Sequence, residues 1–376
     1  MRRIALLGST GSIGRQTLEV IERFPDRFEV VALVGGRDEA TLRAQLEHHS
    51  PALFGLAALE SHDELRTGAA LLLEAAVAQE VDVVVNAVVG SRGLAATLAA
   101  LSAGKIVALA NKESLVAGGA LIEKLLPDPF ERAQRLRPID SEHASMRQAL
   151  QGVRRDEIAR LIITASGGPF RGRTRAQLTD VTIDEALAHP TWSMGNRITI
   201  DSATLVNKGL ELIEAHWLFD VPAAQLDAIV HPQSLVHAIV ELVDGSMLMQ
   251  AAMPDMRLPI AAALFDDERP DAGIARLDLA ATSELRFEPV DHDTFPAVRL
   301  AMAALDAGGS APAAYNAADE EAVAAFLEGR IGFLRITEII EATLSEVGAE
   351  PVGTLPELSE AESRAREVAR SLIDRT

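Results

Sequence analysis

The sequence predicts an α/β protein in three parts: a doubly wound parallel sheet at the N-terminus, a central α/β domain and a C-terminal α-helical bundle. Short apolar segments alternate with Ala- and Leu-rich helical stretches over roughly the first 130 residues, which is typical of a parallel sheet covered by helices. Further strand-like segments flank the hairpin signal Asp244-Gly245. From about Thr294 onwards the pattern is helical and rich in Ala and Glu, which indicates a small bundle.

The first part is expected over residues 1–137. Its strands are predicted, in chain order, at residues 3–7, 28–34, 81–85 and 106–109. Each of these segments is apolar and is followed by a polar or glycine-containing turn. Prolines at positions 127, 129 and 138 mark the change to the next region.

The central part begins with an apolar strand at 161–164 and contains a helical run at 203–219. A polar linker separates it from the bundle. We therefore predict a central domain, a linker and a bundle at residues 138–270, 271–293 and 294–376.

Charge and composition exclude several classes of function. The chain has 376 residues, a formal net charge of −20 and no cysteine. A surface with this much negative charge repels nucleic acid and anionic lipid. We therefore expect neither nucleic acid nor a membrane as a partner. The lack of cysteine excludes disulfides and Cys-ligated metal sites and fits a reducing compartment. No apolar stretch approaches the ~20 residues that span a bilayer, so a soluble cytoplasmic protein is expected.

Lysine is rare in this chain, which makes each lysine informative. There are four, at positions 105, 112, 124 and 208. Lys112 and Lys208 fall inside the motifs described below, where an ammonium group has a chemical use.

A glycine-rich turn follows the first strand and precedes a helical pattern. Gly8, Gly11 and Gly14 allow the backbone to approach a pyrophosphate, and the helix N-terminus supplies N–H donors and a positive dipole. The spacing is G-x-x-G-x-x-G rather than G-x-G-x-x-G. The strand–turn–helix context favours nucleotide binding by a Rossmann-like domain.

The end of the second strand bears on the type of nucleotide. An acidic residue there binds the ribose 2′-OH of NAD, whereas Arg accommodates the 2′-phosphate of NADP. The sequence has both, as Arg37 and Asp38. We favour NADP, with Asp38 as the opposing signal.

Three carboxylates in two motifs indicate a site for a hard metal ion. Asp140 and Glu142 are two residues apart, and Glu211 lies one helical turn after Asn207. Oxygen ligands without cysteine suit Mg²⁺ or Mn²⁺. The alternative is that Asp140 and Glu142 cap a helix that starts at His143.

A polar cluster in the central part suits a phosphate or sugar. Ser166 opens a Gly-Gly turn after a strand, and Ser202, Asn207 and Lys208 offer donors to a phosphate. Residues 189–195 combine aromatic and turn residues, as a mobile lid does. The alternatives are that Trp192 and Met194 are core residues and that His189 ends a helix before Pro190. The histidines at 216, 231 and 237 are interpreted as structural.

Together these segments resemble the 1-deoxy-D-xylulose-5-phosphate reductoisomerase family. The segments that carry the resemblance occur in the family's order and span nearly the whole chain: GSTGSIG (8–14), ALANKESLVAGG (108–119), PIDSEHAS (138–145), TASGGPF (164–170), HPTWSMGNRITIDSATLVNKGLELIEAHWLF (189–219), VHPQSLVHAIVE (230–241), PDMR (254–257) and GRIGFL (329–334). The block from His189 is highly specific.

The resemblance implies a homodimer with an NADPH domain, a central catalytic and dimerisation domain and a helical bundle. It implies metal ligation by Asp140, Glu142 and Glu211, with Lys112, Glu142, His189 and Trp192 as catalytic residues. Implied substrate contacts are Lys112, Ser141, Glu142, Ser166, His189, Ser202, Asn207, Lys208 and Glu211. Implied NADPH contacts are Thr10, Gly11, Ser12, Ile13, Gly36, Arg37, Asp38, Asn111, Glu113 and Gly195. Trp192 would cover the substrate.

The implied activity is NADPH- and metal-dependent isomerisation and reduction of a phosphorylated ketose in the non-mevalonate isoprenoid pathway. The alternatives are another NADP-dependent dehydrogenase of a small phosphorylated carbonyl compound, or an inactive nucleotide-sensing protein. Two positions depart from the family pattern: Asp38 and Asp319 stand where Asn is more usual. Residues 126–137 also differ, which leaves the boundary of the first domain open.

Overall fold

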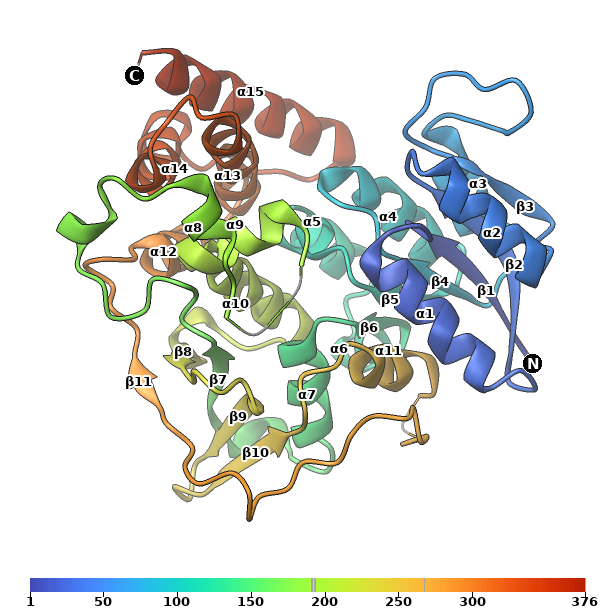
Figure 1. Ribbon diagram of the computed structural model, residues 1–376, viewed down its shortest axis with the longest axis horizontal. Helices are drawn as coiled ribbons and strands as arrows, with labels where there is room; N and C mark the ends of the chain where they lie inside the picture. Colours follow the sequence, from blue (N-terminus) through green and yellow to red (C-terminus); the bar gives the residue numbers. More distant parts are fainter. Residues whose placement is uncertain (191, 193, 267, 376) are drawn as a thin grey trace. The chain divides into compact units, whose positions relative to one another are not determined.

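The computed structural model describes residues 1–190, 192, 194–266 and 268–375. The chain folds into two compact units (Figure 1). Unit 1 comprises residues 1–114, 122–144 and 255–275, and unit 2 comprises 115–121, 145–254 and 276–376. These units group residues 255–275 with the N-terminal part, unlike the predicted domains, whose boundaries stay a prediction.

Unit 1 is built on a parallel sheet whose strands run in the order β3-β2-β1-β4-β5-β6. This order, with the first strand in the middle, is that of a Rossmann fold. The strands are almost entirely apolar and buried, as expected where helices cover both faces of a sheet. They are β1 (Arg2–Leu7), β2 (Phe28–Gly35), β3 (Leu53–Leu56), β4 (Val83–Asn86), β5 (Ile106–Leu109) and β6 (Leu136–Pro138).

The helices of this part of the chain follow the strands in alternation. Asp38 and Asp128 cap α2 and α6 by accepting backbone N–H bonds. Helix α11 packs on α1, and Phe265 after it meets Phe24 and Phe28 edge to face. The helical elements are α1 (Ser12–Arg23), α2 (Glu39–His49), α3 (Ala70–Val77), η1 (Ser91–Gly93), α4 (Leu94–Ser102), α5 (Lys112–Leu125), α6 (Pro129–Arg135), α7 (Ser141–Ala149) and α11 (Arg257–Leu264).

Unit 2 contains a mixed sheet with the order β10-β9-β7-β8-β11. Asp244 and Gly245 form the turn between β9 and β10, which pair antiparallel as predicted. The strands are β7 (Ile158–Ala165), β8 (Leu226–Val230), β9 (Val236–Leu242), β10 (Met247–Ala251) and β11 (Glu288–Pro289).

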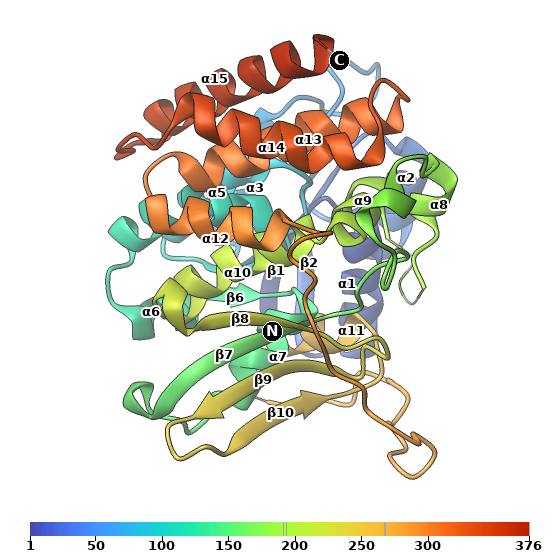
Figure 2. The same ribbon diagram turned by 90° about the vertical axis from the view of Figure 1, so that its left-hand side faces the viewer.

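The helices of unit 2 form a group before β8 and a bundle at the C-terminus. The bundle helices α13, α14 and α15 pack on one another, and α10 contacts both α12 and the strands β7 and β8 (Figure 2). The elements are η2 (Arg155–Glu157), η3 (Arg175–Leu178), α8 (Ile183–Leu187), α9 (Asn196–Thr204), α10 (Val206–Phe219), η4 (Ala223–Gln225), α12 (Ala297–Ala307), α13 (Ala311–Leu327), α14 (Phe333–Val347) and α15 (Leu355–Asp374).

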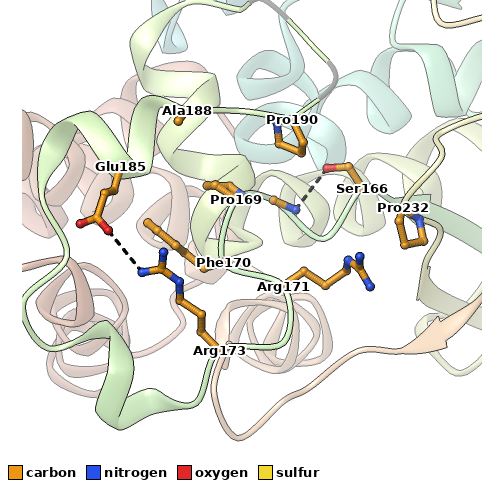
Figure 3. Close-up of a pocket in the computed structure, with 10 residues that line it drawn as sticks. Ser166, Pro169, Phe170, Arg171, Arg173, Glu185, Ala188, Pro190 and Pro232 are labelled. Atoms are coloured by element: carbon orange, nitrogen blue, oxygen red, sulfur yellow. Dashed lines mark hydrogen bonds and ion pairs between the residues drawn. The ribbon is translucent and has the colours of Figure 1, made fainter.

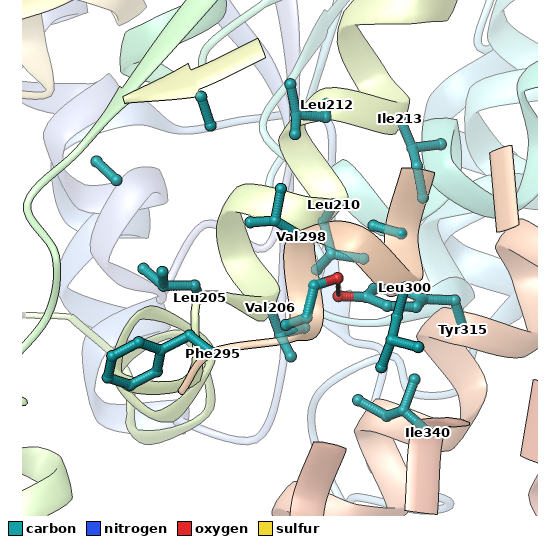
Figure 4. Packing of buried hydrophobic residues seen from close by; sticks show 14 of the residues in the cluster. Leu205, Val206, Leu210, Leu212, Ile213, Phe295, Val298, Leu300, Tyr315 and Ile340 are labelled. Carbon is teal, nitrogen blue, oxygen red and sulfur yellow. Dashed lines mark hydrogen bonds between the residues drawn. The ribbon is translucent and has the colours of Figure 1, made fainter. Parts of the chain in front are cut away.

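Close packing holds α10 in the core of unit 2 (Figure 4). Tyr315 of α13 is fully buried there and donates a hydrogen bond to the carbonyl oxygen of Ala297 at 3.1 Å. A Cβ on Gly209 would lie 2.6 Å from the Tyr315 hydroxyl and 2.7 Å from the Ala301 methyl group. Only glycine therefore allows α10 to approach α12 and α13 this closely.

The structure confirms the predicted fold class and adds details that the pattern did not show. Strands β3 and β6 were not expected, because both are short and lie at or near the edge of the sheet. The helical run predicted at 203–219 is interrupted at Leu205, whose φ of 62° separates α9 from α10. Within the described residues, no helix combines the length and the apolar character that a membrane crossing requires.

Candidate active site

In unit 1, the glycine-rich turn is shaped by backbone contacts. Gly8 has a φ of +84°, and a Cβ there would lie 2.3 Å from the carbonyl oxygen of Ala87. A Cβ on Gly14 would meet the carbonyl oxygens of Gly8 and Ser9 at 2.3 and 2.4 Å. These two glycines fold the turn tightly between β1 and α1, so that the N-terminus of α1 faces the loop, as a pyrophosphate site requires.

The predicted nucleotide contacts Thr10, Gly11, Ser12 and Ile13 all lie where this turn enters α1. Gly11 is the N-cap residue, and no side chain caps the helix there. Thr10 is buried, and its hydroxyl accepts a hydrogen bond from the N–H of Gly36 at 3.4 Å. The turn and the end of β2 are thus joined directly.

Arg37 and Asp38 differ in what they contact. Both are exposed after β2. The Asp38 carboxylate caps α2, accepting from the Thr41 N–H at 3.0 Å and from the Thr41 hydroxyl at 2.6 Å. These two hydrogen bonds lower the pKa of Asp38 below its ordinary value. Because capping occupies Asp38, the acidic residue here does not by itself indicate a ribose contact.

A buried amide network lies at the ends of β4 and β5. The Asn111 side-chain amide donates to the Gly90 carbonyl and to Glu113, each at 2.8 Å, and Glu113 also accepts from the Gly90 N–H at 3.1 Å. Asn86, at the end of β4, donates to the Gly93 carbonyl and to the Thr97 hydroxyl, each at 2.9 Å. Asn111 and Glu113 therefore hold the loop around Gly90 in place.

Asn86 was not among the predicted site residues. Its signal was a polar residue that ends an apolar strand, directly before a glycine-containing loop. Its position, at the carboxyl edge of a doubly wound sheet, is where such folds bind ligands.

Asp140 lies at the start of α7 and serves as its cap. Its Oδ1 atom accepts from the N–H groups of Glu142 and His143 at 3.2 and 3.4 Å, while Oδ2 lies 3.0 Å from the Lys112 ammonium. Ser141 donates its hydroxyl proton to the Glu142 carboxylate. The capping alternative is thus correct for Asp140, with the helix starting at Ser141 rather than at His143. Capping uses one oxygen and does not exclude a metal.

In unit 2, α10 presents a buried ion pair. Lys208 and Glu211 are 3% and 1% exposed, and the Lys208 ammonium contacts Glu211 Oε2. Asn207 donates its amide to the other oxygen of Glu211. One helical turn therefore gathers an amide, a cation and a carboxylate.

His189 joins two serines from different elements. Its Nε2 atom lies 3.1 Å from the hydroxyl of Ser166, which follows β7, and 3.1 Å from the hydroxyl of Ser202 on α9. Its Nδ1 atom accepts the backbone N–H of Trp192 at 2.9 Å. Because Nδ1 accepts, the neutral ring carries its proton on Nε2 and directs it at the serines. Ser166 also accepts the Gly168 N–H at 3.2 Å, so its own proton is left for a ligand.

The predicted lid is only partly described. Thr191 and Ser193 lie outside the described residues. Trp192 and Met194 are half-buried rather than core residues, and Gly195 is the N-cap residue of α9. Helix α8 ends at Leu187, so His189 does not end a helix. The rings of His216, His231 and His237 contact the backbone carbonyls of Val221, Arg286 and Ala252 respectively.

A pocket of about 440 Å³ adjoins the Ser166 turn (Figure 3). Arg173 lies over the Phe170 ring at 5.1 Å and 3.4 Å from Glu185, while Arg171 pairs with Glu288 at 2.8 Å. Both arginines are therefore neutralised by glutamates, and this pocket is not a strongly basic one.

Comparison with known proteins assigns the chain to one family. Family models match residues 4–119 (1-deoxy-D-xylulose 5-phosphate reductoisomerase), 136–219 (1-deoxy-D-xylulose 5-phosphate reductoisomerase C-terminal domain) and 251–368 (DXP reductoisomerase C-terminal domain). The chain is 50% identical to the 1-deoxy-D-xylulose 5-phosphate reductoisomerase of Thermomicrobium roseum, over 99% of this chain and 98% of that protein. It is 47% identical to the enzyme of the same name from Chlorobium chlorochromatii, over 99% and 100%.

Solved structures agree. The reductoisomerase from Zymomonas mobilis in complex with NADPH is 41% identical and superposes with a TM-score of 0.90, covering 100% of both chains. A DOX-P reductoisomerase in complex with NADPH, fosmidomycin and magnesium is 37% identical with a TM-score of 0.91, covering 100% of this chain and 98% of that one.

The His189 contacts predict a titration. Burial lowers the pKa of His189 below its ordinary value of 6.5, so the ring is neutral at pH 7 and gains its proton only below pH 6.5. We expect ¹⁵N–¹H NMR of the ring to show a protonated Nε2 and an unprotonated Nδ1 at pH 7, with a titration midpoint below 6.5. A midpoint above 6.5, or the Nδ1–H tautomer, would contradict the assigned hydrogen bonds.

Proposed function

The chain belongs to the 1-deoxy-D-xylulose 5-phosphate reductoisomerase family, and from this premise we propose how its residues divide the work of the reaction. It catalyses the NADPH- and divalent-metal-dependent isomerisation and reduction of 1-deoxy-D-xylulose 5-phosphate to 2-C-methyl-D-erythritol 4-phosphate, in the non-mevalonate isoprenoid pathway. The observation that supports this function is the similarity of nearly the whole chain to reductoisomerases, at up to 50% sequence identity. It decides against a metal-independent dehydrogenase. The cytoplasmic location stays a prediction.

The metal ligands that we propose are Asp140, Glu142 and Glu211. Each offers a carboxylate oxygen, the hard donor that Mg²⁺ and Mn²⁺ prefer. Asp140 and Glu211 each contact a lysine ammonium, so both carboxylates are already held in the charged form that a cation needs. When bound, the ion supplies Lewis-acid polarisation of the ketose oxygens, and NADPH supplies the hydride.

The nucleotide fits the turn of unit 1. Gly8 and Gly14 bring the backbone close, and α1 offers an N-terminus that no side chain caps. We assign the pyrophosphate to residues 10–13 and the 2′-phosphate to Gly36 and Arg37. Asn111, Glu113 and Gly195 are assigned as further NADPH contacts, as the resemblance implies.

The substrate phosphate belongs, in our proposal, to the hydroxyls of Ser166 and Ser202, with His189, Asn207 and Lys208. Neutral His189 holds both serines through Nε2. Their own hydroxyl protons then serve as donors to phosphate oxygens. Ser141, Lys112 and Glu142 are assigned to the reacting end of the ketose, and Trp192 to the cover over it. Binding energy from the phosphate can orient that end.

Asp140→Asn tests the metal site separately from helix capping. Asn caps a helix about as well as Asp, so α7 should keep its cap, while the contact of the Lys112 ammonium with Oδ2 loses its negative partner. Turnover of NADPH with 1-deoxy-D-xylulose 5-phosphate should fall by more than the ~10–100-fold that loss of an outer-shell partner costs, while the Kd for NADPH stays unchanged. Asp128→Asn, at the cap of α6, is the matched control and should change neither turnover nor the Kd for NADPH. Near-normal kcat in Asp140→Asn at saturating Mg²⁺ would refute the assignment.

Arg37→Ala tests cofactor selection. A charge-assisted contact to the 2′-phosphate is worth ~1.5–3 kcal/mol, so the Kd for NADPH should rise by roughly 10–150-fold and that for NADH hardly at all. Asp38→Asn keeps the cap and removes a negative charge, which should increase the preference for NADPH. Arg43→Ala on α2, whose partners are Glu39 and Glu64, is the control. Equal losses for both nucleotides in Arg37→Ala would show that Arg37 does not read the phosphate.

We also propose a homodimer formed through β10. This strand ends the sheet of unit 2, and Met247, Leu248 and Met249 on it are 49%, 39% and 46% exposed. An edge strand with exposed apolar side chains is a template for pairing with another chain.

Sedimentation equilibrium tests the dimer. The mass should be twice the chain mass of 40.1 kDa. Met247→Lys combined with Met249→Lys should halve it, because charged side chains on an edge strand oppose pairing. The control is Leu285→Lys, at another exposed apolar residue of unit 2. A monomeric native chain at micromolar concentration would exclude the proposal.

A further inference from the structure

Arg197 lies in the first turn of α9 and contacts four side chains of two helices. Its guanidinium group lies 2.8 Å from Glu320, 3.0 Å from the Asn316 amide oxygen and 3.3 Å from Asp319, all on α13. It also lies 3.6 Å from Asp201, one turn further along α9.

The position is electrostatically unfavourable for an arginine on local grounds. The N-terminus of a helix carries a partial positive charge and favours acidic side chains. The Arg197 side chain is also largely buried, at 17% exposed. Asp201 and Asp319 compensate for this unfavourable position. They are 2% and 0% exposed, and they need a cation nearby to stay charged. Tertiary contacts, and not helix propensity, therefore place Arg197.

The contacts continue through the bundle. Glu320 also pairs with Arg366 of α15 at 2.5 Å, and Arg366 lies 3.8 Å from Glu321 and from Glu362. The N-terminal turn of α9 is thereby tied to α13 and, through Glu320, to α15.

Helix α9 carries a residue of the phosphate-binding group. Ser202 follows Asp201 directly, and its hydroxyl lies 3.1 Å from His189 Nε2. A rotation or shift of α9 moves that hydroxyl relative to Ser166, which is fixed at the end of β7. Buried ion pairs contribute little net stability but restrict geometry, so a network of this kind suits positioning better than stabilisation.

We propose that Arg197 is a positioning residue for substrate binding: clamped to Asp319 and Glu320 of the bundle, it sets the place of α9 so that Ser202 and Ser166 share His189 and together receive the substrate phosphate. The inference rests on the proposed role of Ser202 as a phosphate contact. In this proposal Arg197 acts through α9 and is not assigned to the substrate itself.

The test compares Arg197→Met, Arg197→Lys and Asp319→Asn with Arg370→Met. Arg370 pairs with Glu321 of α13 at 2.7 Å and makes an arginine–glutamate contact within the bundle that does not involve α9. We expect Arg197→Met to raise the KM for 1-deoxy-D-xylulose 5-phosphate about tenfold, the effect of one lost ~1.4 kcal/mol contact, with the Kd for NADPH unchanged. Arg197→Lys should recover most of the loss. Asp319→Asn keeps an acceptor and should change the KM less than threefold, and Arg370→Met should not change it.

A second readout does not depend on activity. The ¹⁵N shift of His189 Nε2 in the substrate-free protein reports its hydrogen bonds, and it should move in Arg197→Met but not in Arg370→Met. If Arg197→Met does not fold, the proposal is tested with Arg197→Lys, by its KM and by its His189 ¹⁵N shift. Lower stability with an unchanged KM and an unchanged His189 shift would overturn the proposal, because Arg197 would then stabilise the fold without positioning Ser202.

Ser202→Ala separates this inference from the proposed function. If Ser202→Ala leaves the KM unchanged, the phosphate role of Ser202 is wrong. A moved His189 signal in Arg197→Met would then show that the clamp positions α9 without serving phosphate binding, which overturns the functional part of the inference. If Ser202→Ala raises the KM and Arg197→Met does not, only the inference about Arg197 fails.

Discussion

The buried ion pair between Lys208 and Glu211 constrains the whole of unit 2. Removing one partner of such a pair leaves an uncompensated charge and typically costs about 3–5 kcal/mol, so α10 has to keep both. The helix contacts the sheet through β7 and β8 and the bundle through α12 and α13. The charged pair shares the helix with buried apolar residues such as Val206 and Ile213. Between the two charged residues, Gly209 lets the Tyr315 hydroxyl and the Ala301 methyl group lie against the helix backbone.

Two aspartates that cap helices in this protein, Asp140 and Asp38, are also predicted ligand contacts. Asp140 shares one carboxylate between the N–H groups of α7 and the Lys112 ammonium. Asp38 uses its carboxylate entirely on Thr41. Sequence motifs treat these two aspartates alike, as acidic residues next to a functional segment. The structure distinguishes them, because both carboxylate oxygens of Asp38 bond Thr41, whereas only one oxygen of Asp140 caps its helix.

The sequence was sufficient for the fold class. The alternation of apolar and helical segments predicted the parallel sheet, and the Asp-Gly hairpin and the helical C-terminus were also correct. The missing details are tertiary. Leu205 adopts a left-handed conformation that its apolar side chain does not signal, and Arg197 opposes its own helix dipole because of carboxylates more than a hundred residues away. Asn86 was overlooked because a single asparagine at a strand end has no distinctive spacing. The roles of individual site residues stay predictions.

The shared contact of His189 divides one donor between two acceptors. The ring fixes the direction of its single Nε2–H bond, and the hydroxyls of Ser166 and Ser202 lie at the same distance from Nε2, so neither hydroxyl receives an undivided hydrogen bond from the ring. Because the ring donates at this atom, each serine can direct its own proton away from it. A ligand that accepts both protons on separate oxygen atoms satisfies the two serines together, as a phosphate group can.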